Sequence, residues 1–309
     1  MAQSKSLKSV FSYQSWIHAV SGATGGVIAM SVFYPLDTIR LRLQLDDPEC
    51  RKAQNTFKIL LQLAKDEGIY SLYRGLIPVL ESLCISNFVY FYTFHSLKAL
   101  NGSPKNQSVL KDLMLGIVAG VVNVLTTTPF WVVNTRLKLK GVSGVLNESN
   151  KHYDNLVHGL LYIGRTEGIR GLWAGTIPSL LLVINPALQF MMYEAIKRKL
   201  TKIYGELPSL SYFAIGAVAK AFATVLTYPL QLVQTKQRHG GDKKVSAKDN
   251  AGTIKLLLHI VKSQGAKGLF RGLEAKMIQT ILTAALMFAT YEKIATSVTS
   301  ALTRQPRFK

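Results

Sequence analysis

The sequence predicts an all-α membrane protein with six transmembrane helices arranged as three tandem two-helix repeats. Two observations predict this fold class. Hydrophobic residues make up 48% of the 309 residues, yet the formal net charge is +20, so apolar and basic residues must be segregated along the chain. A motif built around a proline also recurs at Pro35, Pro129 and Pro229. Such a repeat indicates one body made of three copies rather than two domains of about 150 residues each.

Six apolar stretches, each with at most one charged residue, are near the length of about 20 residues that spans a bilayer core as a helix. The last of them needs residues 273–276 to reach full length. A soluble helical protein would need far more apolar partner surface than the polar remainder of the chain offers, which argues against that alternative. The six stretches are Trp16–Tyr34, Leu76–Phe94, Leu113–Val133, Leu172–Tyr193, Leu207–Val233 and Met277–Tyr291.

Each predicted repeat has the same order of elements within a single domain of residues 1–309. A first span ends at the proline motif, a basic loop and a short surface helix follow, and a second span completes the repeat. Apolar residues at helical spacing predict the surface helices at Phe57–Asp66, Leu156–Thr166 and Ile254–Ser263. The repeats cover residues 15–100, 108–200 and 209–298 approximately.

The proline motif carries charged or polar residues at fixed positions. Proline in a span frees backbone groups and bends the helix, so Pro35, Pro129 and Pro229 are predicted hinges. Charged residues just beyond three bends can converge on one face of the membrane and form a gate. The copies read Pro35-Leu-Asp37-Thr-Ile-Arg40-Leu-Arg42, Pro129-Phe-Trp131-Val-Val-Asn134-Thr-Arg136 and Pro229-Leu-Gln231-Leu-Val-Gln234-Thr-Lys236.

A lysine interrupts the pattern of small residues that precede the prolines. Gly116 and Gly120 precede the second proline by 13 and 9 residues, a spacing that lets membrane helices approach closely. At the same offsets repeat three has Gly216 and Lys220. An ionisable residue in a span usually faces a polar cavity, which makes Lys220 a candidate substrate contact. The alternative is a side chain that extends to the membrane surface or pairs with Glu81 without touching a ligand.

Motifs typical of enzymes and metal sites are missing from the sequence. No P-loop, GxGxxG, HExxH or nucleophile motif occurs in a plausible context, which argues against an enzyme. Cys50 and Cys84 are the only cysteines, so the sequence holds neither a disulfide framework nor a CxxC metal pattern. We therefore expect no catalytic residues, no metal site and no permanently bound cofactor.

The chain resembles the mitochondrial carrier family, whose signature is Pro-x-(Asp/Glu)-x-x-(Lys/Arg)-x-(Lys/Arg), then (Asp/Glu)-Gly-x(4)-aromatic-(Lys/Arg)-Gly, three times over. The resemblance covers roughly Ser15 to Ser297, and repeat one matches in full. It implies a pseudo-threefold carrier barrel that acts as a monomer, contacts membrane lipid and anionic small molecules, and does not bind nucleic acid. Repeats two and three depart from the signature at Trp131, Asn134, Ala174, Gln231 and Gln234.

Three stretches are most similar to carriers of adenine-nucleotide-type cofactors in the peroxisomal membrane: Asn87–Tyr92, Thr128–Leu137 and Tyr228–Gln231. This similarity implies exchange of coenzyme A, FAD, NAD, AMP or related adenine nucleotides by alternating access. It also implies recognition by the receptor that imports peroxisomal membrane proteins. The alternatives are a mitochondrial inner-membrane carrier for NAD, folate or pyrimidine nucleotides, a weakly gated channel, and a membrane scaffold.

The family resemblance implies one gate on each side of the membrane. On the organelle side it pairs Asp37 with Asn134, Trp131 with Gln234, and Gln231 with Arg40. On the cytosol side it pairs Glu292 with Lys98, His95 with Lys197, and Glu194 with Ala295. Only the pair of Glu292 and Lys98 is oppositely charged, and a neutral hydrogen bond contributes about 1 kcal/mol. Both gates are therefore predicted to be weak, which would allow net uniport beside exchange.

The resemblance also implies substrate contacts in the second span of each repeat. The contact points are Ser82, Leu182 and Gln279, followed by Leu83, Val183 and Thr280. Glu81 and Lys276 are further charges at this depth, and Asn87 and Asn185 supply amides for a ring edge or ribose. The alternative for Lys276 and the asparagines is hydrogen bonding between helices. A basic cluster is expected to attract a phosphate-bearing anion: Arg40, Arg136, Lys220, Lys236 and Lys276.

Overall fold

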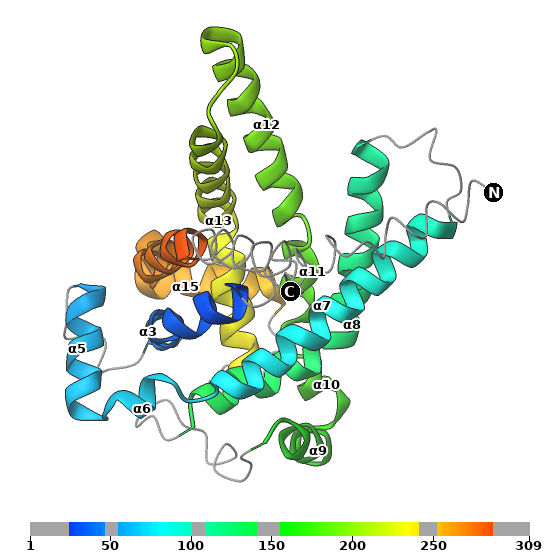
Figure 1. The fold of residues 1–309 in the computed structure, drawn as a ribbon. Coiled ribbons are helices and arrows are strands. Elements are labelled where there is room, and N and C mark those ends of the chain that lie inside the picture. The colour runs from blue at the N-terminus through cyan, green and yellow to red at the C-terminus, as the bar shows by residue number, and fades with distance from the viewer. Residues whose placement is uncertain (1–24, 47–54, 101–108, 141–154, 241–251, 287–309) are drawn as a thin grey trace, which may run out of the picture.

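The computed structural model describes residues 25–46, 55–100, 109–140, 155–240 and 252–286, and every regular element in these ranges is a helix. In repeat one, residues 25–32 are helical, and α3 (Tyr34–Gln44), α5 (Thr56–Asp66), α6 (Ile69–Leu72) and α7 (Leu76–Leu100) follow. Figure 1 shows α7 as a long rod that extends away from the shorter helices. The all-α prediction is thus confirmed for the described part.

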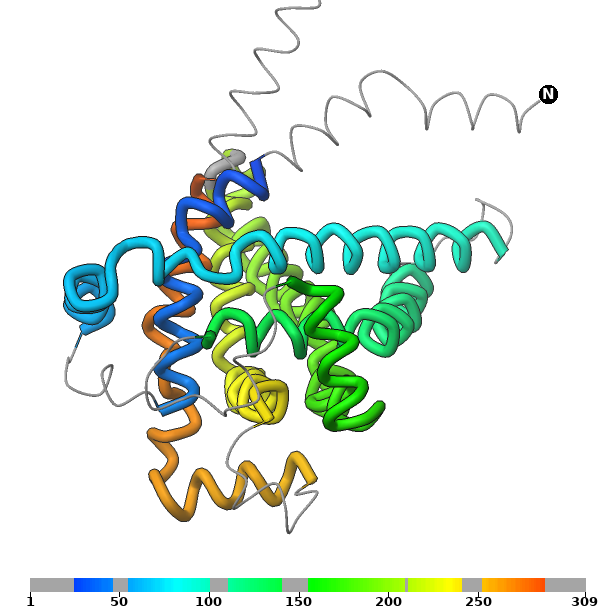
Figure 2. The backbone as a smooth tube through the Cα atoms, turned by 90° about the horizontal axis from the view of Figure 1, so that it is seen from below, coloured from blue at the N-terminus to red at the C-terminus, as the bar shows by residue number. Residues whose placement is uncertain are grey.

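Repeats two and three repeat this order. Repeat two contains α8 (Val109–Lys138), α9 (Leu156–Thr166), α10 (Gly168–Leu172), α11 (Thr176–Leu182) and α12 (Asn185–Tyr204). Repeat three contains α13 (Ser209–His239), α15 (Thr253–Gly268) and the helical residues 273–286. Figure 2 shows residues 273–286 running beside α3, so the described part of repeat three lies next to that of repeat one.

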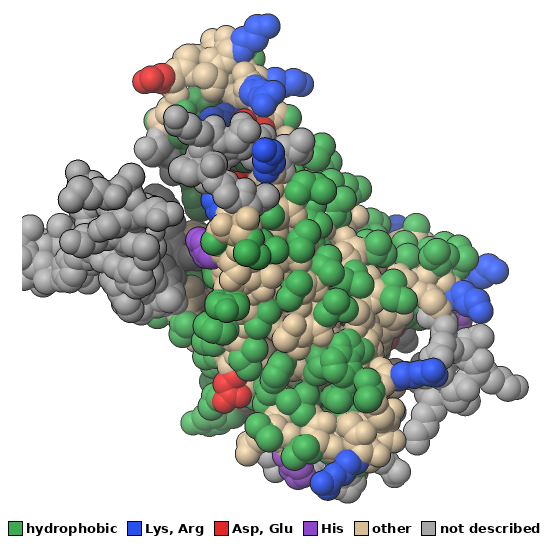
Figure 3. Space-filling model, turned by 90° about the vertical axis from the view of Figure 1, so that its right-hand side faces the viewer, with side chains coloured by type: hydrophobic (Ala, Val, Ile, Leu, Met, Phe, Trp, Pro, Cys, Tyr) green, Lys and Arg blue, Asp and Glu red, His purple; other side chains and the backbone are tan. Residues whose placement is uncertain are grey.

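Four helical stretches in the described part are long and apolar enough to cross a membrane: Ile69–Leu100, Lys111–Lys138, Gly168–Tyr204 and Ser211–His239. They correspond to four of the six predicted spans. The other two, Trp16–Tyr34 and Met277–Tyr291, extend beyond the described residues. In Figure 3, hydrophobic side chains cover the middle of one face and lysine and arginine side chains lie toward its ends, as a lipid-facing surface requires.

The long helices pack in pairs that join neighbouring repeats. Helix α7 lies along α8, and α12 lies along α13. Helices α8, α11 and α13 also contact one another near the lower end of the view in Figure 1, whereas the two pairs lean apart toward the opposite end. Among the described helices, the contacts that join α8, α11 and α13 therefore lie toward one end of the two pairs.

One short amphipathic helix packs on the proline helix of each repeat. Helix α5 places Ile59 and Leu63 against Ile39 of α3. In repeat two, Leu156 and Ile163 of α9 pack on α8, and in repeat three Ile260 of α15 packs on α13. The three predicted surface helices are therefore present, and each buries its apolar face on its own repeat.

The glycine that ends each copy of the signature contacts the next repeat, so that the three repeats form a ring. Gly75, Gly175 and Gly272 have φ values of 80°, 78° and 79°, a conformation that favours glycine. Each also lies against the proline helix of the next repeat. A Cβ added at Gly75 would lie 3.3 Å from the Lys138 backbone, at Gly175 3.1 Å from the Gln234 carbonyl, and at Gly272 3.2 Å from the Arg40 carbonyl. The contacts run from repeat one to two, two to three, and three to one, as a pseudo-threefold arrangement requires.

The prolines act differently in the three repeats. Pro35 begins α3 after a break at Phe33, whereas Pro129 and Pro229 lie inside the continuous helices α8 and α13. Proline has no N–H, so Pro129 leaves the carbonyl of Leu125 without its helical donor. The indole N–H of Trp173 donates to that carbonyl at 2.9 Å. A side chain from the neighbouring span thus replaces the lost bond.

Repeats one and three use a tyrosine at the corresponding junction. Tyr34 and Tyr228, which precede their prolines, donate to the carbonyls of Arg74 and Arg271 at 2.9 and 2.7 Å. The second predicted span of repeat two also contains a break that we did not predict. It separates α11 from α12 just before Pro186, which lies in the first turn of α12 and cannot donate to a preceding carbonyl.

Candidate substrate cavity and gate

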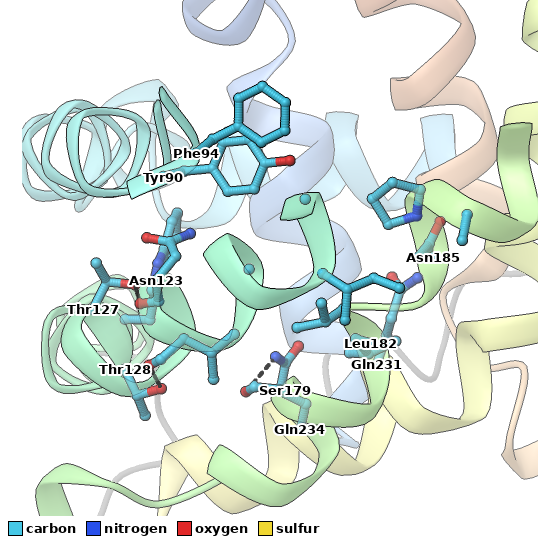
Figure 4. Close-up of a pocket in the computed structure, with 18 of the residues that line it drawn as sticks. Tyr90, Phe94, Asn123, Thr127, Thr128, Ser179, Leu182, Asn185, Gln231 and Gln234 are labelled. Atoms are coloured by element: carbon cyan, nitrogen blue, oxygen red, sulfur yellow. Dashed lines mark hydrogen bonds between the residues drawn. The ribbon is translucent and has the colours of Figure 1, made fainter. Parts of the chain in front are cut away.

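A cavity of about 620 Å³ lies between α7, α8, α11, α12 and α13. Tyr90 and Phe94 form one wall, and Figure 4 shows them above the polar side chains of the other helices. Of the expected substrate contacts, Leu182, Val183 and Asn185 line this cavity. The remaining polar and charged lining consists of Asp112, Asn123, Thr127, Thr128, Ser179, Gln231, Gln234 and Arg238, beside the aromatic Trp131.

Hydrogen bonds between helices fix the amides in this cavity. Asn185 donates to the Thr227 hydroxyl at 2.8 Å, and Gln231 donates to the same oxygen at 3.2 Å. Gln234 donates to the Ser179 hydroxyl at 2.7 Å, a bond drawn in Figure 4. These bonds join α12 and α11 to α13, so the polar wall is ordered without a ligand.

The proline end is closed by contacts centred on Asp37. Its carboxylate forms an ion pair with Lys138 of repeat two and lies 3.4 Å from Arg40 of its own helix. Arg40 also donates to the Gln231 amide oxygen at 3.3 Å, so this expected couple comes together. The contacts link all three repeats, and Asp37 is only 9% exposed. Low solvent access makes a charged pair of this kind stronger than one at the surface.

The other two expected couples are replaced by contacts to serines. Asn134 donates to Ser82 at 2.7 Å instead of meeting Asp37. Gln234 donates to Ser179, and Trp131 lies under the guanidinium of Arg238, with 5.9 Å from its carbon to the ring centroid. Asn134 is too short and uncharged to compete with a lysine for Asp37. Lys138, one helical turn further along α8, supplies the charge.

Arg136 and Lys236, which we expected in the basic cluster of the cavity, are engaged elsewhere. Arg136 donates two hydrogen bonds to Glu167 at 2.5 and 2.8 Å, and Arg42 does the same to Glu67 at 2.5 and 2.6 Å. These bidentate pairs fasten each proline helix to its surface helix. Lys236 contacts Asp46 at 2.7 Å.

Asp46 takes over the role of an acid that repeat three lacks. Where repeats one and two have Glu67 and Glu167, repeat three has Gln264. Asp46, from repeat one, accepts hydrogen bonds from Gln264 at 2.8 Å and from Lys236, and it also pairs with Arg271. The absence of an acid at position 264 could have predicted that another carboxylate takes its place. The sequence alone did not show that this carboxylate is Asp46.

The remaining basic residues surround the gate. Lys276 is half-buried and lies within electrostatic reach of Asp37, Arg40, Lys138 and Lys220. Lys220 is exposed on α13. The part of the expected cluster that the structure brings together is therefore Arg40, Lys220 and Lys276.

Other expected substrate residues lie apart from the cavity. Glu81 is exposed on α7, and Asn87 and His95 line a second hollow of about 640 Å³ along that helix. Ser82 is buried by its bond to Asn134, and Gln279 is 5% exposed. None of these side chains is among the residues lining the cavity.

Of the expected cytosol-side couples, only His95 with Lys197 lies wholly within the described residues, and no contact between these two side chains is seen there. Lys98 pairs with Asp112 on α8 at 3.2 Å, and Lys197 lies 3.8 Å from Glu194 on its own helix. Glu292 and Ala295 lie outside the described residues. Among the described residues, the helix pairs diverge toward this end in Figure 1.

Comparison with known proteins shows which family the chain belongs to. The family model described as "Mitochondrial carrier protein" matches residues 11–103, 105–204 and 205–301, one match per repeat. The chain belongs to the mitochondrial carrier family. The carrier is 53% identical over 294 residues to peroxisomal membrane protein PMP34 of Mus musculus, covering 93% of this chain and 95% of the relative.

Two plant carriers are also similar to this carrier. The peroxisomal nicotinamide adenine dinucleotide carrier of Arabidopsis thaliana is 32% identical, with 90% of this chain and 94% of the relative covered. The mitochondrial nicotinamide adenine dinucleotide transporter 2 of the same plant is 33% identical, with 92% and 81% covered. The carrier fold with three repeats follows from the family match and the helical architecture.

Proposed function

We propose that this carrier exchanges adenine-nucleotide cofactors, namely coenzyme A, FAD, NAD and AMP, across the peroxisomal membrane by alternating access. The observation that carries the proposal is the cavity above the gate, whose lining combines ordered amides and hydroxyls with aromatic rings and lies close to basic residues. A nucleotide presents the complementary groups: a ring edge, a ribose and a phosphate.

Each part of the site suits one part of such a ligand. Asn123, Asn185 and Gln231 offer amides for the base edge or ribose hydroxyls. Tyr90 and Phe94 offer flat apolar surface to a purine ring. Arg40, Lys220 and Lys276 supply positive charge toward the proline end, where a phosphate would be drawn. Glu81, Asn87, Ser82 and Gln279 join the site only if the helices move.

The gate supplies the coupling between binding and transport. In the described state the proline end is held by Asp37 with Lys138 and by Arg40 with Gln231. A charged hydrogen bond contributes about 1.5–3 kcal/mol, so an anion that competes with Asp37 for Arg40 would weaken the contacts of this end by an energy of that order. Helix bending at Pro35, Pro129 and Pro229 would then expose the cavity on the other side.

Several relatives support the location and the substrate class. The mouse relative is named as a peroxisomal membrane protein, and one plant relative as a peroxisomal carrier of nicotinamide adenine dinucleotide. The mitochondrial plant transporter keeps the mitochondrial inner membrane as the second candidate location. We further propose that the carrier is not an enzyme, that it works as a monomer, and that the peroxisomal membrane-protein import receptor delivers it.

The test of this function is counter-exchange in proteoliposomes. Vesicles containing the full chain would be loaded with one compound and challenged with a panel of coenzyme A, FAD, NAD, AMP, ATP and carboxylates. We expect the cofactors and AMP to exchange. Exchange of carboxylates alone would overturn the proposal, and imaging of a tagged protein decides between peroxisome and mitochondrion.

A further inference from the structure

Arg238 brings a cation to the floor of the cavity. It lies in the last turn of α13, nine residues beyond Pro229. Its guanidinium lines the cavity and donates to the Ser179 hydroxyl at 3.2 Å. The same group lies over the ring of Trp131 on α8. Arg238 therefore stands where α8, α11 and α13 come together.

No carboxylate pairs with Arg238 among the described residues. Its Nε is buried and has no hydrogen-bond partner. Other arginines of the motifs are paired: Arg42 with Glu67, Arg136 with Glu167 and Arg271 with Asp46. Arg238 is partly exposed where it lines the cavity. A cation that has no carboxylate partner and a buried, unbonded Nε is suited to an anion from outside the protein.

The equivalent positions in the other repeats are already occupied by protein contacts. Repeat one has Gln44, which donates to Tyr228 at 3.1 Å and accepts from Thr235 at 2.9 Å. Repeat two has Lys138, which pairs with Asp37. Only the third copy of this position, among the three, combines a positive charge with donors that face the cavity.

The cation–π contact of Arg238 with Trp131 suits a phosphate ligand. An aromatic ring takes the face of a guanidinium and leaves the N–H groups in its plane available. Those in-plane donors form a fork that matches two phosphate oxygens. Arg40 lies within electrostatic reach of Arg238 and adds positive potential on the same side.

We propose that Arg238 binds the phosphate of the transported nucleotide at the floor of the cavity, with Trp131 holding the plane of its guanidinium. This inference rests on the proposed function and names the residue that would recognise the phosphate. Both Arg238 and Gln234 donate to Ser179. An anion that draws Arg238 away from Ser179 would leave Gln234 as the remaining donor to that hydroxyl. Because Gln234 is one of the expected gate residues, binding of the anion would be coupled to the gate.

The test compares AMP with adenosine, which differ only in the phosphate. Thermal unfolding of the purified full chain in detergent would be followed during titration with each compound. In Arg238→Gln, which introduces the residue that repeat one has at this position, we expect the apparent affinity for AMP to fall at least about tenfold. Weak binding of adenosine should stay unchanged. Arg238→Lys keeps the charge without the fork and should lie between the two.

Arg170→Gln is the matched control, because Arg170 is exposed on α10 and lies outside the cavity. It should bind AMP as the wild type does. If Arg238→Gln keeps the preference of AMP over adenosine, the inference is wrong. A lower unfolding temperature without ligand, with the AMP response intact, would assign Arg238 a purely structural role and also overturn the inference. Failure of wild-type protein to exchange any cofactor in proteoliposomes would instead overturn the proposed function.

Discussion

At the scale of single residues, the base that pairs with Asp37 in the gate lies at a different position from the one in the family signature. The family signature places a base at the position of Asn134, and in this chain the base that meets Asp37 is Lys138. The two positions are one helical turn apart, so both reach the same side of α8. The third copy of the Lys138 position is Arg238, which points to the cavity instead.

Replacing Lys138 by glutamine should weaken the closed proline end. Asp37 would lose its partner in repeat two and keep Arg40 at 3.4 Å. We expect Lys138→Gln to destabilise the purified protein by about 1–3 kcal/mol, measured as a lower thermal unfolding temperature in detergent.

The matched rescue for this variant adds Asn134→Lys, which restores the base at the signature position. The double variant should recover part of the lost stability, because position 134 is one helical turn from Lys138 on the same side of α8 and a lysine side chain is longer than asparagine. An unfolding temperature of Lys138→Gln equal to that of the wild type would contradict a gate held by this ion pair.

At the scale of helices, the three prolines differ in what becomes of the carbonyl that each one frees. Helix α8 stays continuous through Pro129, and the indole of Trp173 donates to the carbonyl that this proline frees. No side-chain donor to the Ser31 carbonyl, freed by Pro35, is seen among the described residues, and the helix there breaks at Phe33. Helix α13 stays continuous through Pro229, and no side-chain donor to the freed Val225 carbonyl is seen among the described residues. The indole therefore supports α8 in particular, where water is absent.

Replacing Trp173 by phenylalanine should therefore destabilise α8 locally. The ring is retained and only the N–H donor is lost, so the change isolates one hydrogen bond. We expect a loss of about 1–2 kcal/mol in unfolding free energy, together with faster amide hydrogen exchange around Leu125.

Tyr73→Phe is the control for this prediction, because Tyr73 has the equivalent place in repeat one and its ring stacks on Tyr34 at 6.2 Å between centroids. It should change stability little. Equal stability of Trp173→Phe and Tyr73→Phe would show that the bond to Leu125 is not needed.

At the scale of the whole molecule, the two ends differ. The proline end is held by contacts among all three repeats, whereas the described part of the other end has only contacts within a helix or between neighbouring helices, such as Lys98 with Asp112. Return of the empty carrier must break the ion pair of Asp37 with Lys138, whereas in exchange a bound anion can weaken it. The empty return is therefore expected to be the slower of the two routes.

We therefore expect net uptake of AMP into vesicles that contain no internal substrate, at a rate below that of exchange. The measurement is radiolabelled AMP uptake into empty proteoliposomes, with protein-free vesicles as the control. Strict one-for-one exchange, with no uptake into empty vesicles, would contradict this prediction.

The sequence was sufficient for the fold but not for the pairing of side chains in the gate. Apolar length and the repeated proline motif predicted the spans and surface helices, because both depend on local pattern. The partners of Asn134, Gln234 and Arg136 depend on distances across repeats, which a pattern does not contain. Ser82 and Ser179, for example, became partners of amides only because α7 and α11 bring their hydroxyls within 2.7 Å.

The contacts of Asp46 make the three copies of the motif mutually dependent. Lys236, Gln264 and Arg271 of repeat three all rely on this carboxylate from repeat one. At the corresponding position repeat two has Lys140 and repeat three has Gly240. If a copy of repeat two replaced repeat one, the counterpart of Lys140 would stand in place of Asp46 and would repel Lys236 and Arg271. The three repeats are therefore not interchangeable, because each one depends on the sequence of its neighbour in the chain's present order.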